Sequence, residues 1–364
     1  MKQTDVLVVG GGPAGLRAAL SAAGAGARVT VIERASRMGG QLVKQTHMFF
    51  GAKEQYASVR GVDIPGRLLA ELARFGARVE LLTDCTALGV YEDGVVTALR
   101  GGEYFKLKPK SLVVATGAHE RALAFPNNDL PGIYGAGAVQ TLMNVYGVRP
   151  GRRVLMVGAG NIGLIVSYQL LQSGVDVAMI IDAAPKIGGY LVHAAKVRRM
   201  GVPIYTSRTV ARAEGRNRLE RAVTVGLDAR FSPILGSEEV VVADVMCVSV
   251  GLCPLTELLA MAGCEIHYIP QLGGSVPVRN GEYETSVPGV FVAGDASGIE
   301  EASAAMVEGA LAGLYAARRA GYVHPAEAET AARLRAELRA LRSGEAGRHI
   351  RAGLEQLEKG ASCV

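Results

Sequence analysis

Cysteine and aromatic residues are scarce in this 364-residue sequence, and tryptophan is absent. The cysteines are odd in number and form no C-x-x-C or C-x4-C pair; they are Cys85, Cys247, Cys253, Cys264 and Cys363. This spacing argues against a disulfide framework, a redox dithiol and an iron–sulfur centre within the chain. No group of histidines, cysteines and carboxylates has metal-ligand spacing either, so we expect no metal site. A reducing compartment, the cytoplasm, suits these cysteines best.

Strong charge of one sign is also missing. The net charge is only +5 and the lysines and arginines are scattered, so the sequence carries no footprint for nucleic acid. The first apolar run starts within a few residues of Met1, which leaves no room for a signal peptide. One uncharged stretch, residues 154–175, is long enough to span a bilayer, but its glycines follow a phosphate-loop pattern. We therefore expect a soluble, cytoplasmic protein without a transmembrane segment.

Glycine is abundant, and the 47 glycines include an informative group near the start. The apolar run of residues 5–9 predicts a buried strand, which ends at the G-x-G-x-x-G loop of residues 10–15. The first glycine permits a tight turn, the second lets backbone approach a pyrophosphate, and the third lets the next helix pack closely. The following strand ends at Glu33, whose carboxylate would accept hydrogen bonds from ribose hydroxyls. This stretch predicts an adenine dinucleotide without a 2′-phosphate as the ligand.

The same unit occurs a second time in residues 153–182, with three loop glycines and with Asp182 at the acid position. In both copies a glycine pair begins six residues after the acid, Gly39–Gly40 in the first and Gly188–Gly189 in the second. We therefore expect two dinucleotide-binding domains, each a parallel sheet with helices on its faces. The alternative is one functional site and one empty structural copy.

Other segments complete the two candidate sites. Residues 43–51 are expected to form a packed lid or an interface, with Lys44 and His47 as possible hydrogen-bonding partners of a ligand. The candidate cofactor-binding residues of the first site are Gly10, Gly12, Pro13, Ala14, Gly15, Glu33, Arg34, Gly40, Gln41, Thr86, Ala115, Thr116 and Gly117. Those of the second site are Gly158, Gly160, Asn161, Ile162, Gly163, Asp182 and Gly251. No set of side chains predicts a catalytic acid, base or nucleophile.

Four motifs occur in an order that points to a family. The first loop with its acid is followed by A-T-G at residues 115–117, by the second loop, and by T-x-x-P-G-x-F-x-A-G-D ending at Asp295. This set resembles the FAD-dependent pyridine-nucleotide reductases of the thioredoxin reductase-like group, over about residues 5–320. The resemblance implies FAD in the first site and NAD(H) in the second.

The resemblance also implies roles for the late motif. Gly294 and Asp295 would lie at the ribityl and pyrophosphate part of FAD, with Asp295 accepting from a ribityl hydroxyl. A helix beginning near Glu301 and Ala302 would direct its N-terminus toward the flavin. For Glu300 and Glu301 themselves we expect favourable placement of acids at a helix N-terminus rather than catalysis.

A narrower likeness rests on residues 130–142, 146–151 and 298–313. These look like the nucleotide-binding subunits of heteromeric dye-linked amino-acid dehydrogenases, a set that includes opine oxidase, hydrogen cyanide synthase and sarcosine oxidase alpha subunits. The likeness implies two partner subunits, of which one contains flavin and oxidises an amine and the other holds an iron–sulfur centre. Because this chain lacks a cysteine-rich segment, the iron–sulfur centre would belong to another polypeptide.

Together these features predict an α/β fold with two Rossmann-like dinucleotide-binding domains, the second inserted in the first, plus a short helical C-terminal tail. The expected bounds are 1–130 and 265–323 for the FAD-binding domain, 131–264 for the NAD(H)-binding domain and 324–364 for the tail. Three functions stay open: an oligomeric flavoprotein subunit that relays electrons between NAD(H) or an amino-acid-oxidising partner and a carrier, a free-standing NADH:acceptor reductase, and a nucleotide-binding scaffold with ATP or NAD in the second site.

The tail carries an apolar stripe on two short predicted helices. Leu334, Leu338 and Leu341 lie at helical spacing on the first, and residues 350–357 continue the pattern on the second. We expect this stripe to dock a partner subunit or a second copy of the chain, because the family core is complete near Ala320. The alternative is that the tail folds back onto its own domain.

Overall fold

The structure is a computed structural model that describes residues 1–49, 52–345 and 347–361. Phe50 and Gly51, the end of the expected lid segment, lie outside the described residues, as does Cys363.

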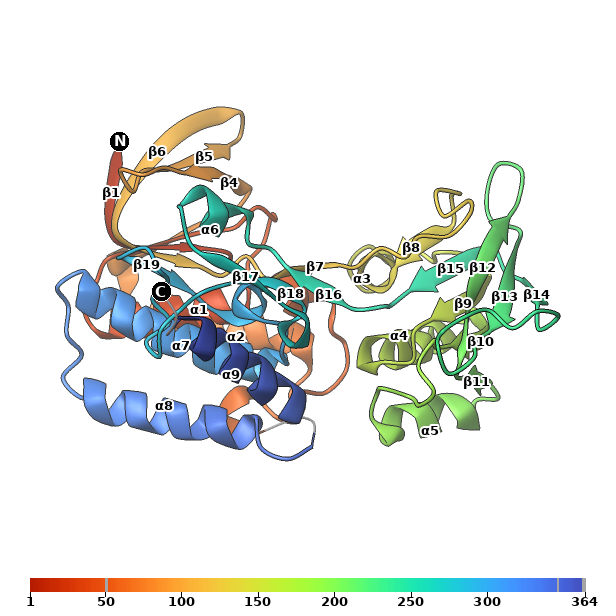
Figure 1. The fold of residues 1–364 in the computed structure, drawn as a ribbon. Helices are drawn as coiled ribbons and strands as arrows, with labels where there is room; N and C mark the ends of the chain where they lie inside the picture. The colour runs from red at the N-terminus through yellow and green to blue at the C-terminus, as the bar shows by residue number, and fades with distance from the viewer. Residues whose placement is uncertain (50–51, 346, 362–364) are drawn as a thin grey trace. The chain divides into compact units, whose positions relative to one another are not determined.

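The chain divides into two compact units, Met1–His119 with Leu252–Val364, and Glu120–Gly251 (Figure 1). The second unit is inserted in the first, and each unit contains a sheet of parallel strands with helices, as predicted. The division falls after His119 and Gly251, whereas the boundaries expected from the sequence follow residues 130 and 264.

The first unit is built on a seven-stranded sheet with the order β3-β2-β1-β6-β5-β4, in which β19 also pairs with β6. Val8 of β1 lies between Val31 and Val113 in parallel register. The central strands are buried because their sequences are nearly continuous apolar runs. The strands are β1 (Lys2–Val9), β2 (Val29–Ile32), β3 (Val79–Leu82), β4 (Cys85–Val90), β5 (Val96–Arg100), β6 (Glu103–Val114) and β19 (Val290–Val292).

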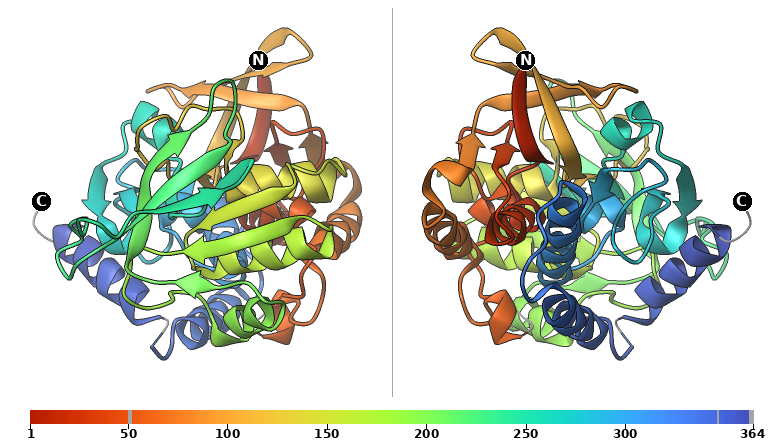
Figure 2. Two further views of the ribbon diagram at one scale, coloured as in Figure 1. Left: turned by 90° about the vertical axis from the view of Figure 1, so that its right-hand side faces the viewer. Right: turned by 90° about the vertical axis from the view of Figure 1, so that its left-hand side faces the viewer.

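Helices α1 and α7 of this unit pack unusually closely (Figure 2). A side-chain carbon added at Gly309 would lie 2.0 Å from the carbonyl oxygen of Ala14, and one at Gly313 would lie 2.1 Å from that of Ala18. Glycine at these two positions therefore lets the backbones approach each other. The helices of the unit are α1 (Pro13–Gly24), α2 (Ile64–Ala73), α6 (Glu257–Met261), α7 (Ala302–Arg319), α8 (Glu327–Leu341) and α9 (Arg348–Ala361).

The second unit has a five-stranded parallel sheet of order β11-β10-β9-β15-β8 and a separate antiparallel sheet of order β12-β13-β14. Buried aliphatic side chains form a core on each face of the parallel sheet. The strands are β8 (Ile133–Gly135), β9 (Arg153–Val157), β10 (Asp176–Ile181), β11 (Ile204–Tyr205), β12 (Arg208–Glu214), β13 (Arg221–Gly226), β14 (Glu239–Val242) and β15 (Val245–Val248). The helices are α3 (Ala136–Gln140), α4 (Asn161–Gln172) and α5 (Leu191–Arg199).

Short elements connect these parts. The remaining strands are β7 (Ala118–Glu120), β16 (Leu252–Pro254), β17 (Ile266–Ile269) and β18 (Gly274–Pro277). The short helical turns are η1 (Gly40–Lys44), η2 (Lys53–Gln55), η3 (Gly61–Asp63), η4 (Gly76–Arg78), η5 (Thr141–Val145), η6 (Pro270–Leu272) and η7 (Gly294–Ser297).

The C-terminal tail folds back onto the first unit. In α8, Ala331, Leu334 and Leu338 are buried in the core that contains α1 and α7. In α9, Leu357 is buried against the cluster formed around β17 and β18, with Ile350 and Leu354 packed beside it. The prediction that this apolar stripe docks a partner is therefore wrong, because these side chains are already used within the chain.

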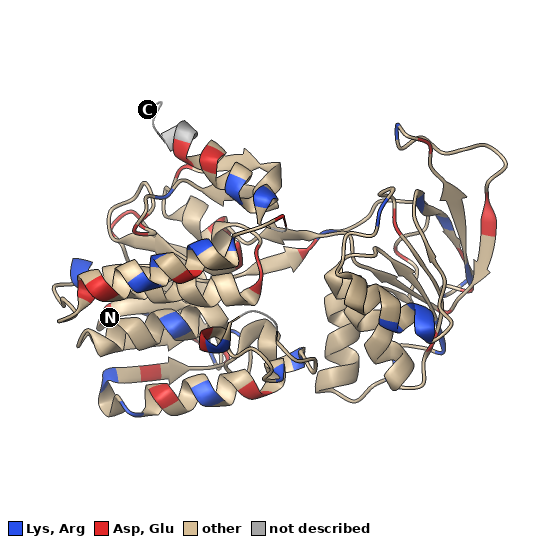
Figure 3. Ribbon diagram, turned by 90° about the horizontal axis from the view of Figure 1, so that it is seen from below, with Lys and Arg blue, Asp and Glu red and all other residues tan. Residues whose placement is uncertain are grey.

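The helices of the described residues include none with the length and apolar character needed to cross a membrane. Lysines and arginines are interspersed with aspartates and glutamates along helices α2 and α8 of the first unit, whereas α5 of the second unit carries only basic charges (Figure 3).

Candidate functional site

The first glycine loop connects β1 to α1 and leaves no room for side chains at two positions. Gly10 has a φ of +110°, and a side-chain carbon there would lie 2.2 Å from the carbonyl oxygen of Ala115. A carbon at Gly15 would lie 1.8 Å from the carbonyl oxygen of Gly10. At Gly12, by contrast, an added carbon would lie 3.8 Å from Cα of Gly40, an ordinary contact distance, so it would overlap nothing. The tight contacts of the loop are therefore at its first and last glycines, and the backbone of Gly40 lies beside its middle glycine.

Glu33 is held against this loop by two backbone groups. The N–H of Gly11 donates to one carboxylate oxygen at 2.8 Å, and the N–H of Ala35 donates to the other at 2.8 Å. Helix α1 begins with Pro13, has no acidic residue in its first turn and receives no side-chain cap. Its first N–H groups thus remain available to an anionic ligand, and the fixed carboxylate remains available to hydroxyl groups. These donors and acceptors fit a nucleotide.

The second loop, between β9 and α4, has the same construction. A side-chain carbon at Gly158 would lie 2.1 Å from the carbonyl oxygen of Ser249, and Gly160 would meet nothing within 4 Å. Asp182 accepts hydrogen bonds from the N–H groups of Ala159 at 2.6 Å and Ala184 at 2.8 Å. The internal repeat seen in the sequence is therefore also a repeat of backbone geometry, because each acid is held by the loop and by the second residue after itself.

The two copies diverge beyond the acid. The N–H of Gly39 donates to the carbonyl oxygen of Gly11 at 2.7 Å, whereas in the second copy the N–H of Gly189 donates to that of Ala159 at 2.9 Å. Gly39 therefore corresponds in structure to Gly189. Counting six residues from each acid in the sequence would instead pair Gly39 with Gly188. Asn161 Oδ1 also accepts the N–H of Tyr190 at 2.8 Å. The equivalent residue of the first copy, Pro13, has no side-chain acceptor and cannot form this hydrogen bond.

The strand ends expected beside each loop are found there. The N–H of Ala115 donates to the carbonyl oxygen of Val9 at 2.8 Å, directly after β6, and Thr116 Oγ1 donates to the carbonyl oxygen of Leu255 at 2.8 Å. Gly117 and Gly251 both adopt positive φ, +75° and +115°. These residues shape the carboxyl ends of the parallel strands in the two sheets, which is where ligands of such strands bind.

The remaining candidates of the first site lie near its acid or on η1. Arg34 is exposed beside Glu33, and Gln41 is exposed on η1 next to Gly40. Thr86 is exposed on β4, immediately after Cys85, whose N–H donates to the carbonyl oxygen of Glu33 at 2.9 Å. In the lid segment, the ring of His47 stacks on that of Phe49 with centroids 6.3 Å apart.

The late motif meets the first loop in space. Gly294 adopts a φ of +69°, and a side-chain carbon there would lie 2.8 Å from Cβ of Ala14 at the start of α1. Asp295 follows in η7 and is partly buried; burial raises the pKa of its carboxyl to about 7, and the nearby Glu308 and Glu300 carboxylates add to the rise. Helix α7 begins at Ala302 with Glu301 in the capping position, as expected.

A buried carboxylate that the sequence reasoning missed supports this motif. Glu308 lies in α7 and its side chain is 2% exposed. One oxygen accepts the N–H of Gly294 at 3.0 Å and Ser297 Oγ at 2.9 Å, and the other accepts Tyr283 Oη at 3.1 Å. A signal existed in the sequence, since Glu308 is the one charged residue in the run 302–317.

The tail also reaches this cluster. Arg342, just after α8, donates from Nε to both oxygens of Glu300 at 3.0 Å and from Nη2 to Glu308 Oε1 at 2.6 Å. Glu300 precedes α7, as expected for an acid at a helix N-terminus, and it also forms a two-pronged ion pair with Arg342 that the sequence did not indicate. The tail therefore contacts residues next to the late motif.

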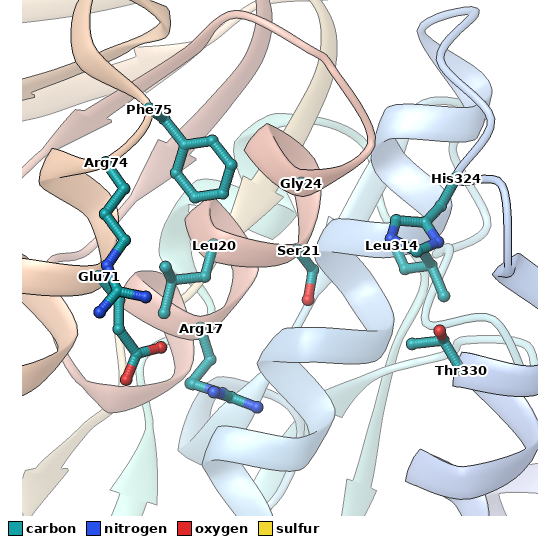
Figure 4. A pocket seen from close by; sticks show the side chains of 10 residues that line it. All are labelled: Arg17, Leu20, Ser21, Gly24, Glu71, Arg74, Phe75, Leu314, His324 and Thr330. Carbon is teal, nitrogen blue, oxygen red and sulfur yellow. The ribbon is translucent and has the colours of Figure 1, made fainter.

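A separate pocket of about 280 Å³ lies along α1, α2 and α7 and is shown in Figure 4. Arg17, Arg74, Glu71 and His324 line it together with apolar residues, but none of the candidate cofactor-binding residues does. Among the described residues, no group of three or more His, Cys, Asp or Glu side chains is placed to hold a metal ion.

Comparison with known proteins gives a consistent result. The family profile described as pyridine nucleotide-disulphide oxidoreductase matches residues 4–309. An opine oxidase subunit of Agrobacterium tumefaciens is 30% identical over 339 residues, which cover 86% of this chain and 65% of that protein. The sarcosine oxidase alpha subunit of a Corynebacterium species is 30% identical over 336 residues, or 88% of this chain and 33% of that protein. The chain thus spans two thirds or less of these relatives.

Solved structures agree with the fold. L-Proline dehydrogenase from P. horikoshii matches with a TM-score of 0.72 and 25% identity, over 93% of this chain and 59% of that one. Thioredoxin reductase from T. acidophilum matches with a TM-score of 0.71 and 21% identity, over 87% of this chain and 99% of that one, which shows the shared fold alone. The resemblance drawn from the motifs is confirmed by these matches.

Proposed function

Because this chain belongs to the pyridine nucleotide-disulphide oxidoreductase family and is an FAD-dependent oxidoreductase or a subunit of one, we propose that it is the flavoprotein subunit of a heteromeric dehydrogenase. In this role it passes electrons between NAD(H) or an amine- or amino-acid-oxidising partner and an electron carrier. The observation that carries the proposal is the repeated loop-and-acid geometry, of which only the first copy is joined by the Gly294–Ser297 turn.

In the proposed FAD site, the loop from Gly10 to Gly15 and the N-terminus of α1 bind the pyrophosphate, and Glu33 accepts from the adenosine ribose. Asp295 accepts from the ribityl chain, which fits a carboxyl that is partly shielded from water beside the start of α1. The absence of any acid in the first turn of α1 favours phosphate there, because no carboxylate of that turn opposes its charge. When bound, the flavin supplies hydride acceptance and the release of single electrons.

In the proposed NAD(H) site, the loop from Gly158 to Gly163 binds the pyrophosphate and Asp182 accepts from the ribose. The two N–H donors on Asp182 fix its carboxylate in place, so that it also repels a 2′-phosphate. ATP shares the phosphates and the adenosine ribose, and it is the alternative ligand of this site.

Partner subunits are proposed because the relatives named as subunits of opine oxidase and sarcosine oxidase are components of multisubunit enzymes. The sequence contains no C-x-x-C or C-x4-C pair, so this chain has no dithiol of its own to receive electrons from a flavin. A redox centre on another polypeptide supplies that step in the proposal.

The first experiment is to release and identify the cofactor of the purified chain. We expect a yellow protein that yields FAD rather than FMN by mass analysis. Recovery of FMN alone, or no uptake of flavin after FAD is added, would contradict the proposed first site.

The second experiment distinguishes the three functions by adding NADH without oxygen. Rapid reduction of a dye by the chain alone would favour a free-standing NADH:acceptor reductase. Reduction of a dye only with co-purified subunits present supports the proposed role within a larger enzyme. Binding of ATP or NAD without any bleaching of the flavin, alone or with those subunits, would favour a nucleotide-binding scaffold.

A further inference from the structure

A buried cluster of four charged side chains joins the tail to the first unit. Glu300 precedes α7, Glu308 lies within it, Arg342 follows α8, and Arg279 approaches Glu308 Oε1 at 3.4 Å. The side chains of these residues are 9%, 2%, 12% and 9% exposed, respectively. Two positive and two negative charges thus balance in a region with little access to water. Such a cluster is stable only if every charge keeps its partner.

The cluster is connected directly to the turn of the candidate flavin site. Glu308 uses one oxygen for Arg342 and the other for the N–H of Gly294 at 3.0 Å and Ser297 Oγ at 2.9 Å. The backbone of Gly294 in turn lies close to the start of α1, since a side-chain carbon added at Gly294 would lie 2.8 Å from Cβ of Ala14. Hydrogen bonds therefore link the tail arginine to a turn that is closely packed beside the first glycine loop.

The packing of α8 determines where Arg342 reaches the buried charge cluster. Ala331, Leu334 and Leu338 are buried on the same side of the helix, and Gln55 Nε2 donates to Glu337 Oε2 at 2.9 Å. The last turn of α8 consequently presents Arg342 inward. Arg339, three residues earlier on the same helix, is exposed.

We propose that Arg342 is a positioning residue of the candidate flavin site, which fixes Glu300 and Glu308 and through them the turn Gly294–Ser297 and the first turn of α7. The inference rests on the proposed function in that FAD is taken as the ligand of this turn. It makes α8 a structural part of the cofactor site. Arg342 itself touches neither glycine loop and acts through the two glutamates.

Loss of Arg342 would leave both glutamates to share Arg279. Asp295, Glu300 and Glu308 face the same space, so the negative charges of these carboxylates would repel one another more strongly. Tyr283 lies beside them as a neutral phenol that donates to Glu308. Burial and the neighbouring Glu308 already raise the pKa of the Glu300 carboxyl, and removal of the guanidinium would raise it further. Protonation of these acids would then disturb the turn at a pH where the unaltered protein keeps it intact.

The test uses the full chain after removal of flavin, with four variants. Arg342→Met removes the charge but keeps a long side chain. Arg342→Lys keeps the charge but lacks the planar guanidinium with its several N–H donors. Arg339→Met is the matched control. The double variant Glu300→Gln with Arg342→Met removes one charge of each sign. FAD affinity is measured by fluorescence across pH, and hydrogen exchange of residues 293–301 is measured without flavin.

We expect Arg342→Met to weaken FAD binding at least tenfold at neutral pH, to shift the acid limb of the binding profile to higher pH, and to speed exchange in residues 293–301. Arg342→Lys should lie between this variant and the unaltered protein, because a lysine cannot hold both glutamates at once. The double variant should recover part of the affinity, and Arg339→Met should stay within twofold of the unaltered chain.

Two results would overturn the inference. One is unchanged FAD affinity and exchange in Arg342→Met. The other is a lower melting temperature with unchanged affinity and pH profile in the folded fraction, which would make Arg342 a stabilising residue only. Failure of the unaltered protein to bind FAD would instead contradict the proposed function; exchange in residues 293–301 would then still decide whether Arg342 holds the turn.

Discussion

The two glycine loops of this protein share a backbone design but differ in what surrounds them. In both, an acid at the end of the second strand accepts N–H groups from the loop and from the second residue after itself. The Gly294–Ser297 turn lies close to the start of α1 beside the first loop, and it is supported by buried charges from α7 and the tail. At the second loop, Ile162 and Leu191 are 39% and 79% exposed. The comparison teaches that the same loop-and-acid backbone can stand in two different surroundings, one with buried charged support and one with exposed apolar neighbours.

The largest expected effect comes from blocking one loop at a time. Gly10→Ala should abolish FAD binding and destabilise the protein by about 3 kcal/mol or more, because the added carbon overlaps a backbone oxygen at a positive φ. Gly158→Ala should abolish NAD(H) binding but leave the FAD content unchanged. Cofactor analysis and nucleotide titration of both variants check this. Loss of FAD from the Gly158→Ala variant would show that the two sites do not bind their ligands independently.

A somewhat smaller effect is expected from the support of the first site. Leu338→Ala leaves a cavity between α8 and the core around α7, which should cost about 2–4 kcal/mol of unfolding free energy. Because the same helix positions Arg342, flavin should also dissociate more readily, whereas NAD(H) affinity should not change. Denaturant unfolding and titration of each ligand measure these changes. Arg339→Ala, at an exposed position of the same helix, serves as control. Equal losses of FAD and NAD(H) affinity in Leu338→Ala would show that α8 does not support the first site specifically.

The second site should discriminate between nucleotides by charge. Asp182 close to a 2′-phosphate should disfavour NADPH by roughly 1–3 kcal/mol after solvent screening, a preference for NADH of about ten- to hundredfold. Asp182→Ser should remove most of this preference, while Asp129→Asn, an exposed acid of the same unit, should retain it. Calorimetric titration with both nucleotides decides the matter. Equal affinities in the unaltered protein would show that Asp182 does not face the ribose.

The smallest effect concerns the ionisation of Asp295. Its pKa is raised to about 7 in the folded chain, so its contribution to flavin-free stability is present below about pH 4 and is lost as pH rises through 7. Asp295→Asn should therefore stabilise the flavin-free protein by roughly 1 kcal/mol at pH 8, with no gain at pH 4. FAD affinity should fall about tenfold, since an amide accepts less strongly than a carboxylate. Denaturant unfolding of the variant and of the unaltered protein at pH 4 and pH 8 provides the check. The prediction fails if the variant is not the more stable of the two at pH 8.

The local parts of both sites could be predicted from the sequence. Gly10, Gly15 and Glu33 are recognisable because a tight turn, a close helix contact and a strand-end acid depend on neighbouring residues. The repeat at Asp182 followed for the same reason. The apolar stripe at Leu334 and Leu338 was also visible, but its packing partner was not.

What only the tertiary structure decided is the environment of the first site. Glu308 and Arg342 are far from the first loop in the chain. Glutamate and arginine are also common on protein surfaces, so the residue types alone do not single these two out. Their importance arises from burial and from pairing with Glu300 and Gly294, which depend on how α7 and α8 pack. Hydrophobic periodicity indicates that a helix buries one face, but it does not specify against which surface. The sequence by itself therefore determined two glycine loops with their acids, and packing decided that Arg342 of the tail pairs with the glutamates before and within α7.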